Sequence, residues 1–411
     1  MADNKDKKVL NVPDLRFPEF SGEWEEHYLA EYLDFKNGLN PSANKFGSGI
    51  KFISVMDILN NDFITYDCIR TSVKITPEEQ VAFAVEKGDV LFQRSSETLE
   101  DVGRANVYMD DQPAVFGGFV IRGKKKAEYN PMFFRYLLAS PYARKKVIPM
   151  GAGAQHFNIG QDGLSKVKLH FPILQEQQRI AALLRLIDER ISVQNKIIEK
   201  YESLIQAMCD TLIGKETQHV TLSFSDFGQS YSGLSGKSAE DFGEGYPFIT
   251  YMNVYQNRII DSKDVGFVKI NKAEQQSVVR YGDILLTLSS ETPEEVGMGA
   301  VYLGETYPLY LNSFCFGIHI TNDAKIYPPF LAYYVSSQSF RKAVYPLAQG
   351  STRFNLQKSD FMKKRFSFPV IEKQRKIYSI FKGYSDKLIV EKLIMRLLCN
   401  QKCYLLRQLF I

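Results

Sequence analysis

Two segments of this chain, about 195 residues apart, have nearly the same sequence. Residues 88–108 and 282–302 are identical at 12 of 21 positions, where unrelated segments would share about one. The match continues further along the chain, where Phe157-Asn158 returns as Phe354-Asn355. A repeat of this length is far longer than one solenoid unit, so it predicts two related domains in tandem.

Each half predicts the same order of elements. A strand-rich region comes first, and a Gly-Asp turn then leads into a short apolar strand, Val90–Phe92 or Ile284–Leu286. A helix that begins at a proline follows, Pro131–Leu138 or Pro328–Val335. A glycine-containing loop and a long helix complete each half.

The long helices carry the strongest periodic pattern. Apolar residues recur in steps of four and three from Ile180 to Leu212, with charged residues and glutamine between them and no proline or glycine between Gln175 and Ile213. Such a heptad pattern predicts a coiled-coil seam, on a helix roughly 55–60 Å long. The seam positions of the first helix are Ile180, Leu184, Ile187, Ile191, Gln194, Ile198, Tyr201, Ile205, Met208 and Leu212.

The second helix repeats this seam 197 positions later, although Gly383 weakens it locally. Its positions are Ile377, Phe381, Tyr384, Leu388, Glu391, Met395, Leu398, Lys402, Leu405 and Leu409. Gln194 and Glu391 are polar and lie at the middle of their helices, so they meet whether the helices pack parallel or antiparallel. They therefore do not decide the relative direction of the two helices. Chain topology favours the antiparallel pair, because a parallel one would crowd both globular halves at one end. An apolar stripe buried on a single domain is the simpler alternative.

These patterns predict a mixed α+β fold: two duplicated domains held apart by an antiparallel two-helix coiled coil with pseudo-two-fold symmetry. We expect a first recognition domain over residues 1–174 and its helix over 175–213. The second domain should span residues 214–370, and its helix 371–411.

Bulk composition restricts the class of protein only weakly. No apolar run approaches the length of a membrane span, and the polar N-terminus lacks the apolar core of a secretory signal, so we expect a cytoplasmic protein. The net charge of +4 permits binding to nucleic acid without arguing for it. Of the five cysteines, only Cys399 and Cys403 are close together, and we interpret them as small core residues rather than metal ligands.

Short motifs that accompany the repeat carry a resemblance to a known family. They are Leu15–Phe20 with Trp24, the Gly-Asp turns at 88–91 and 282–285, and the Phe-Pro-led helix starts at 171–180 and 368–375. In this order, repeated around a coiled coil, they resemble the specificity subunits (HsdS) of type I restriction–modification systems over nearly the whole chain.

The resemblance implies a DNA-binding function without catalysis. Each domain would recognise one half of a bipartite double-stranded DNA target, and the helices would set the spacing and dock two methyltransferase subunits. A restriction subunit that translocates DNA would complete the complex. S-adenosylmethionine, ATP and Mg would bind those partners and not this chain.

Candidate catalytic motifs fail on inspection. Tyr327-Pro-Pro-Phe330 has Tyr where an amino-methyltransferase needs Asp or Asn, and its counterpart in the first half also has the sequence of a helix start. Gly236-Lys237-Ser238 lacks the earlier glycine of a phosphate loop, because that position is Tyr231. The histidines show no metal-ligand spacing.

DNA contact needs polar and basic side chains on rigidly held loops. One candidate is the strand end Gln93, Arg94, Ser95 and Ser96, with its counterpart Thr287, Leu288, Ser289 and Ser290. Another is the glycine loop with Gln155, His156 and Asn158, and in the second half Ser351, Thr352, Arg353 and Asn355. The third is the basic tract 122–126 with Lys124 and Lys125. Surface positions without a ligand are the alternative for all three.

Two other classes of function stay open. A protein-binding scaffold with two related heads on a helical rod would bind its partners without preference among duplexes. An enzyme with an unrecognised site would turn over substrate as the purified chain. Binding through phosphates differs from both in its steep dependence on salt.

Arg94 gives a first test, because Arg can bind guanine through two hydrogen bonds and its counterpart Leu288 cannot. We expect Arg94→Ala to weaken or relax recognition of one half-site and to leave the other half-site intact. Binding assays with duplexes altered in one half at a time would measure this. Equal loss at both halves would contradict the assignment.

Overall fold

The computed structural model describes residues 10–214, 218–271 and 273–411. The chain forms two compact units, Met1–Asn195 with Leu393–Ile411, and Lys196–Lys392. Residues 1–9, which make up most of the polar N-terminal segment used above, lie outside the described residues. Among the described helices, none combines the length and the apolar character that crossing a bilayer requires.

The first unit is built on a four-stranded antiparallel sheet in the order β2-β9-β5-β7. A second sheet, β4-β3-β8, and the pairs β1-β11 and β6-β10 flank it. The strands are β1 (Glu25–Tyr28), β2 (Leu33–Asn37), β3 (Phe46–Ile53), β4 (Ser72–Val73), β5 (Val90–Gln93), β6 (Ser95–Ser96), β7 (Ala105–Val107), β8 (Val115–Phe116), β9 (Val120–Lys125), β10 (Phe157–Asn158) and β11 (Lys168–Phe171). The helices are α1 (Leu29–Tyr32), α2 (Val55–Asn60), α3 (Pro77–Ala82), α4 (Pro131–Ala139), α5 (Pro141–Val147), α6 (Gln161–Ser165) and α7 (Leu174–Gly214).

The second unit repeats this plan, with sheets ordered β13-β20-β16-β18 and β15-β14-β19, the pair β12-β23, and the small sheet β17-β22-β21. The strands are β12 (His219–Ser223), β13 (Gly228–Ser232), β14 (Phe242–Ile249), β15 (Val265–Val268), β16 (Ile284–Thr287), β17 (Ser289–Ser290), β18 (Gly299–Val301), β19 (Tyr310–Leu311), β20 (Cys315–Ile320), β21 (Ala348–Gln349), β22 (Phe354–Leu356) and β23 (Arg365–Pro369). The helices are α8 (Tyr251–Gln256), α9 (Pro328–Tyr334), α10 (Gln338–Val344), α11 (Lys358–Lys363) and α12 (Ile371–Gln408).

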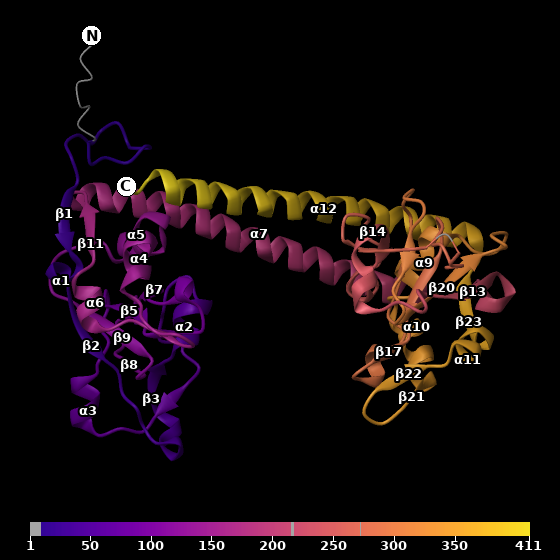
Figure 1. The fold of residues 1–411 in the computed structure, drawn as a ribbon, viewed down its shortest axis with the longest axis horizontal. Helices are drawn as coiled ribbons and strands as arrows, with labels where there is room; N and C mark the ends of the chain where they lie inside the picture. The colour runs from indigo at the N-terminus through magenta and orange to yellow at the C-terminus, as the bar shows by residue number, and fades with distance from the viewer. Residues whose placement is uncertain (1–9, 215–217, 272) are drawn as a thin grey trace, which may run out of the picture. The chain divides into compact units, whose positions relative to one another are not determined.

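Short helices connect the sheet of each unit to the long helices. In the first unit α4 and α5 lie beneath α7 (Figure 1), and Phe133, Phe134, Tyr136 and Leu137 of α4 are fully buried. A proline occupies the first turn of α4 and of α9, where the missing N–H group costs no hydrogen bond. The predicted proline-led helices are therefore confirmed.

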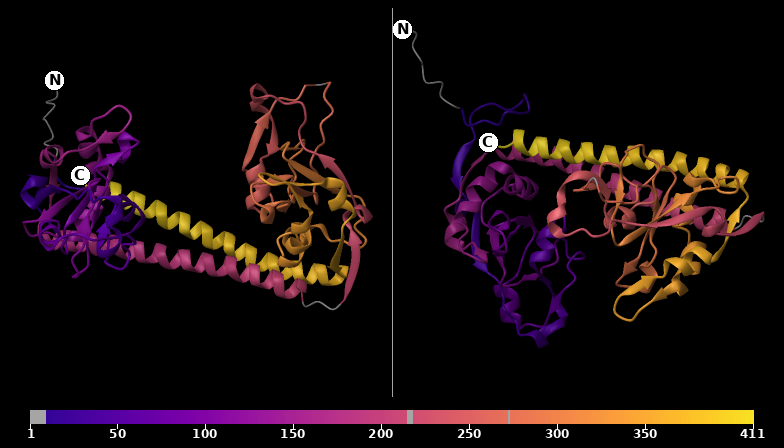
Figure 2. Two further views of the ribbon diagram at one scale, coloured as in Figure 1. Left: turned by 90° about the horizontal axis from the view of Figure 1, so that it is seen from below. Right: turned by 45° about the vertical axis from the view of Figure 1, so that its right-hand side comes forward.

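The two long helices pack antiparallel, which each unit shows on its own (Figure 2). In the first unit Ile180, near the start of α7, shares a core with Leu405 and Leu409, near the end of α12. In the second unit Cys209, near the end of α7, shares a core with Phe381, near the start of α12. The mixed fold with duplicated domains and an antiparallel helix pair is confirmed, and α12 continues through Gly383 without a break.

The seam separates buried from exposed positions on these helices. Leu184 and Phe381 are fully buried, and Leu398 and Leu405 nearly so.

The interpretation of Cys399 and Cys403 as core residues is wrong, because both are exposed. Each follows a seam position by one residue, and one step on a helix turns a side chain by about 100° away from the seam.

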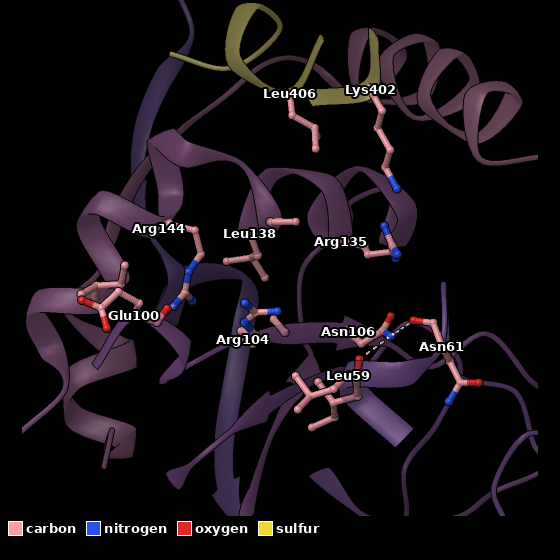
Figure 3. A pocket seen from close by; sticks show the side chains of 14 residues that line it. Leu59, Asn61, Glu100, Arg104, Asn106, Arg135, Leu138, Arg144, Lys402 and Leu406 are labelled. Carbon is pink, nitrogen blue, oxygen red and sulfur yellow. Dashed lines mark hydrogen bonds between the residues drawn. The ribbon is translucent and has the colours of Figure 1, made fainter. Parts of the chain in front are cut away.

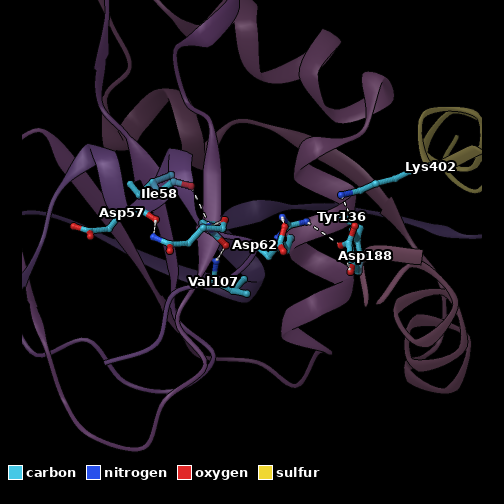
Figure 4. Close-up of polar contacts among 10 residues, drawn as sticks. Asp57, Ile58, Asp62, Val107, Tyr136, Asp188 and Lys402 are labelled. Atoms are coloured by element: carbon cyan, nitrogen blue, oxygen red, sulfur yellow. Dashed lines mark hydrogen bonds and ion pairs between the residues drawn. The ribbon is translucent and has the colours of Figure 1, made fainter. Parts of the chain in front are cut away.

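A buried charged network holds α4, α7 and α12 together in the first unit (Figure 4). Asp188 of α7 is 2.5 Å from Lys402 Nζ and accepts a hydrogen bond of 2.8 Å from the Tyr136 hydroxyl. Arg135 lies 4.0 Å from the same carboxylate. In the second unit the corresponding contact is neutral, since the Tyr333 hydroxyl and Ser385 Oγ are 2.7 Å apart.

We expect Lys402→Ala to destabilise the first unit by about 1–3 kcal/mol, because it removes the nearest positive charge from a buried carboxylate. Unfolding in urea can be followed by the fluorescence of Trp24, the single tryptophan, which is buried in this unit. Arg185→Ala is the control, because it breaks an exposed pair with Glu189 and should change stability by less than about 0.5 kcal/mol. Equal effects of the two variants would contradict the network's role.

Candidate nucleic-acid interface

The strand end and the glycine loop of the first unit form one surface. Strands β6 and β10 pair antiparallel, so that Ser96 faces Phe157 and Ser95 faces Asn158. The Ser95 hydroxyl donates to the Asn158 side chain, and the Ile159 N–H group donates to the Arg94 carbonyl at 2.9 Å. Two candidate places that lie some 60 residues apart in the sequence are thus joined by backbone pairing.

The second unit repeats this surface in the same frame. Ser290 of β17 faces Phe354 of β22, and Ser289 faces Asn355. The Leu356 N–H group donates to the Leu288 carbonyl at 2.8 Å. In Figure 1, β17, β21 and β22 lie at the end of this unit away from the long helices.

A third segment, which the sequence analysis missed, joins each surface. The Arg94 N–H group donates to the Phe119 carbonyl at 2.9 Å, and the Leu288 N–H group donates to the Phe314 carbonyl at 2.8 Å. We call the combined region the strand-end surface, formed by residues 94–96, 117–119 and 152–158 in the first unit, and by 288–290, 312–314 and 349–355 in the second. A signal for this segment exists, because Phe119 and Phe314 occupy equivalent positions of the repeat.

Glycine shapes the tight loops of the strand-end surface. Gly153 and Gly350 have φ of +147° and +139°, which residues with a side chain rarely adopt. A Cβ atom at Gly153 would overlap the His156 carbonyl, and one at Gly350 would overlap that of Arg353. The close approach turns the loop so that the intervening side chains face solvent.

The glycine-loop candidates and Arg94 are accessible, as DNA contact requires. Arg94, Ser95 and Ser96 are partly exposed. The exposed candidates are Gln155, His156 and Asn158 in the first unit, and Ser351, Thr352, Arg353 and Asn355 in the second. They offer amide, imidazole, hydroxyl and guanidinium groups, which can bind base edges and phosphates.

Four candidate residues are buried, so their side chains do not face solvent as the expected direct DNA contact requires. They are Gln93, Thr287, Ser289 and Ser290. Gln93 Nε2 donates to the Ser95 carbonyl at 2.9 Å, and Ser290 Oγ donates to Glu295 at 3.2 Å. Gln93 and Ser290 thus stabilise the loop through these hydrogen bonds instead of facing solvent.

The basic tract is not part of the strand-end surface. Residues 122–125 belong to β9, where Val120 faces Gln93 while Lys125 faces Leu33 at the opposite strand end. Arg122 is buried and donates to the Ala84 carbonyl. Lys124 lies 3.4 Å from Glu86, and Lys125 Nζ donates to the Tyr129 carbonyl. The tract is therefore a paired strand apart from the strand-end surface, and the DNA contact expected of Lys124 and Lys125 stays a prediction.

Equivalent arginines fix the turn that follows the strand end. Arg144 donates to the Glu100 and Val102 carbonyls at 2.7 Å, and Arg341 donates to the Glu294 and Val296 carbonyls at 2.6 and 2.7 Å. Burial, together with the nearby charge of Arg104, lowers the pKa of Arg144 to about 10, and burial also lowers the pKa of Arg341. Both arginines therefore stabilise the loop rather than present charge to a ligand.

A cavity of about 420 Å³ in the first unit is lined by Arg104, Arg135, Arg144 and Lys402 (Figure 3). Arg104 pairs with Asp101 at 2.5 Å, and Arg135 lies 3.5 Å from Asp62. Lys402 pairs with the buried Asp188. Each cation that lines the cavity is thus engaged by a carboxylate or by backbone carbonyls of the protein itself.

The Tyr327-Pro-Pro-Phe330 motif has a structural explanation. Tyr327 immediately precedes α9, and the Arg375 guanidinium lies 4.5 Å from the centre of its ring. Among residues 10–214, 218–271 and 273–411, no group of three or more His, Cys, Asp or Glu side chains is arranged to hold a metal ion.

The chain contains two copies of one domain with mixed helices and strands. Each copy has an exposed strand-end surface and is joined to a long seam helix. This arrangement defines a class of duplicated recognition proteins. The family model described as "Type I restriction modification DNA specificity domain" matches this chain twice, over residues 21–203 and 223–396. The chain therefore belongs to the family of type I restriction–modification DNA specificity subunits. Its role is the recognition of a DNA target.

Named relatives agree with this membership. The type I restriction enzyme MjaVIII specificity subunit of Methanocaldococcus jannaschii is 22% identical over 414 aligned residues, which cover 94% of this chain and 91% of the relative. The EcoKI specificity subunit of Escherichia coli is 23% identical over 303 aligned residues, which cover 69% of this chain and 62% of the relative. The crystal structure of an S subunit from M. genitalium has the same fold, with a TM-score of 0.53, 17% identity and coverage of 97% and 99%.

We expect Gly153→Ala to weaken binding of the first half-site by about tenfold. An alanine at this φ would strain the backbone by about 1–3 kcal/mol, and the loop must move to relieve that strain. The measurement is DNA affinity of the assembled complex, with each half of the duplex altered in turn. Gly160→Ala is the matched control, since its Cβ would meet no atom within 4 Å. A Gly153→Ala protein with unchanged affinity would show that this loop does not bind DNA.

Proposed function

We propose that this chain is the non-catalytic DNA-reading subunit of a type I restriction–modification complex. Each unit recognises one half of a bipartite target through its strand-end surface. The paired helices set the spacing of the two halves and dock two methyltransferase subunits, to which restriction subunits are added. S-adenosylmethionine, ATP and Mg bind those partners, and the chain itself has no active site and acts in the cytoplasm.

One observation carries the assignment of half-sites to the two surfaces. The backbone frame is the same in both units, since Ser95 faces Asn158 and Ser289 faces Asn355. The accessible side chains on this frame differ, with His156 in the first unit where the second has Arg353. A constant frame with exchanged donors and acceptors is what recognition of two different short sequences requires.

Exposed apolar residues on the long helices support docking of protein partners. In the first unit Leu393, Ile394 and Leu397 of α12 are exposed, and in the second unit Ile389 and Val390 are exposed. These residues lie outside the seam. Exposed apolar residues gathered on one helix are typical of protein interfaces.

The test is a genome-wide map of methylated adenines in cells that carry this gene and its methyltransferase partner, compared with cells that lack only this gene. We expect a split motif, two short defined halves around a fixed gap, only when the gene is present. Variants of Arg353 and His156 should then each relax a different half of that motif.

Other outcomes would change the conclusion. An active methyltransferase whose pattern does not depend on this gene would favour a protein-binding scaffold. Turnover of a substrate by the purified chain would favour an enzyme. A pattern with a single undivided motif would contradict the assignment of one half-site to each unit.

A further inference from the structure

Each strand-end surface carries an exposed phenylalanine at the same position of the repeat. Phe119 is 68% exposed and Phe314 is 54% exposed. A phenyl ring has no polar atom and gains nothing from water, so two such rings at equivalent places need an explanation. The neighbouring positions have diverged, since Arg94 corresponds to Leu288, whereas the ring is kept.

The backbone that carries these rings is rigid. Phe119 lies in a turn that the Val120 N–H group closes by donating to the Gly117 carbonyl at 2.8 Å. In the second unit the Cys315 N–H group donates to the Asn312 carbonyl at 3.0 Å, and the Phe314 N–H group donates to Asn312 Oδ1 at 2.9 Å. Each ring also comes immediately before a strand of its unit's four-stranded sheet, β9 or β20. A ring on a fixed turn binds with little loss of conformational freedom.

The surroundings of the rings suit a flat aromatic ligand next to charge. In the first unit Phe119 borders an open hollow of about 380 Å³ that Phe46, Phe52 and Met56 also line. In the second unit the Arg353 guanidinium, which is exposed on the glycine loop, lies 5.8 Å from the centre of the Phe314 ring. Aromatic faces beside Arg are typical of sites where bases stack and phosphates bind.

We propose that Phe119 and Phe314 are base contacts, each stacking on or inserting at a base step of the half-site that its own unit recognises. The inference rests on the proposed function and adds a contact to it. Stacking accepts any base, because every base has a π face, which explains why both units keep the ring while their hydrogen-bonding residues differ. Apolar side chains that enter a base step also unstack it and bend the duplex.

The experiment uses the assembled complex and a duplex with the target found in the methylation map. 2-Aminopurine, a fluorescent adenine analogue that brightens on unstacking, is placed at one step of a half-site at a time. With the unaltered protein we expect brightening at one step in each half. Phe119→Ala should abolish the signal in its own half only, and should lower affinity by about 5- to 100-fold.

Phe314→Ala should produce the same loss in the other half, so each variant is a control for its partner. Phe119→Tyr keeps the aromatic face and should keep the signal. Val81→Ala, an exposed apolar position on α3 outside the strand-end surface, should behave like the unaltered protein.

Two results would overturn the inference while the proposed function stands. One is unchanged affinity and unchanged fluorescence in Phe119→Ala and Phe314→Ala. The other is loss of methyltransferase binding by these variants without DNA, which would assign the rings to a protein interface. Failure of the unaltered complex to bind any bipartite duplex would instead remove the proposed function itself.

Discussion

The contact on which this fold depends most is the burial of the chain's last turns against the start of α7. Leu405, Leu409 and Phe410 enter the same core as Ile180 and Leu184, and Phe410 packs edge-on against Trp24, with ring centres 6.5 Å apart. Without α12 the apolar seam of α7 would face water in the first unit. The C-terminal segment is therefore part of the first unit's hydrophobic core, although it is almost 400 residues away from Trp24 in sequence.

Duplication then allows one framework to serve two recognition tasks. The arginines that fix the turn, the glycines at φ near +140° and the serine-to-asparagine pairing recur in both units. Accessible positions of this framework have diverged, as His156 and Arg353 show. Because substitutions there leave no buried group unpaired, a recognition surface can change without loss of the fold. The same reasoning explains why the junction with the long helices could become ionic in one unit, at Asp188, and neutral in the other, at Ser385.

The candidate site shows where reasoning from the sequence fails. Gln93 and Thr287 differ between the halves and are the last residues of β5 and β16, yet both are buried. A residue that differs between the two repeats can be substituted without loss of the fold. A buried side chain that packs under a loop can meet this condition as well as an exposed one. Lys124 and Lys125 have the charge that phosphate contact requires, but strand register places them opposite Asp34 and Leu33, at the end of β9 away from the strand-end surface. Phe119 and Phe314 were missed because an exposed phenylalanine cannot be told from a buried one by residue type.

The sequence by itself determined the duplication, the long seam helices, the proline-led helices and the family. These properties depend on the order and the spacing of residues that are close in the sequence, and the repeat shows the same order and spacing twice. Only the tertiary structure decided which side chains reach solvent and which distant segments meet. The pairing of β6 with β10, and of the turn at Phe119 with Arg94, arises from hydrogen bonds between backbone groups. Every residue except proline carries the same backbone donor and acceptor, so residue types alone do not predict which segments will pair.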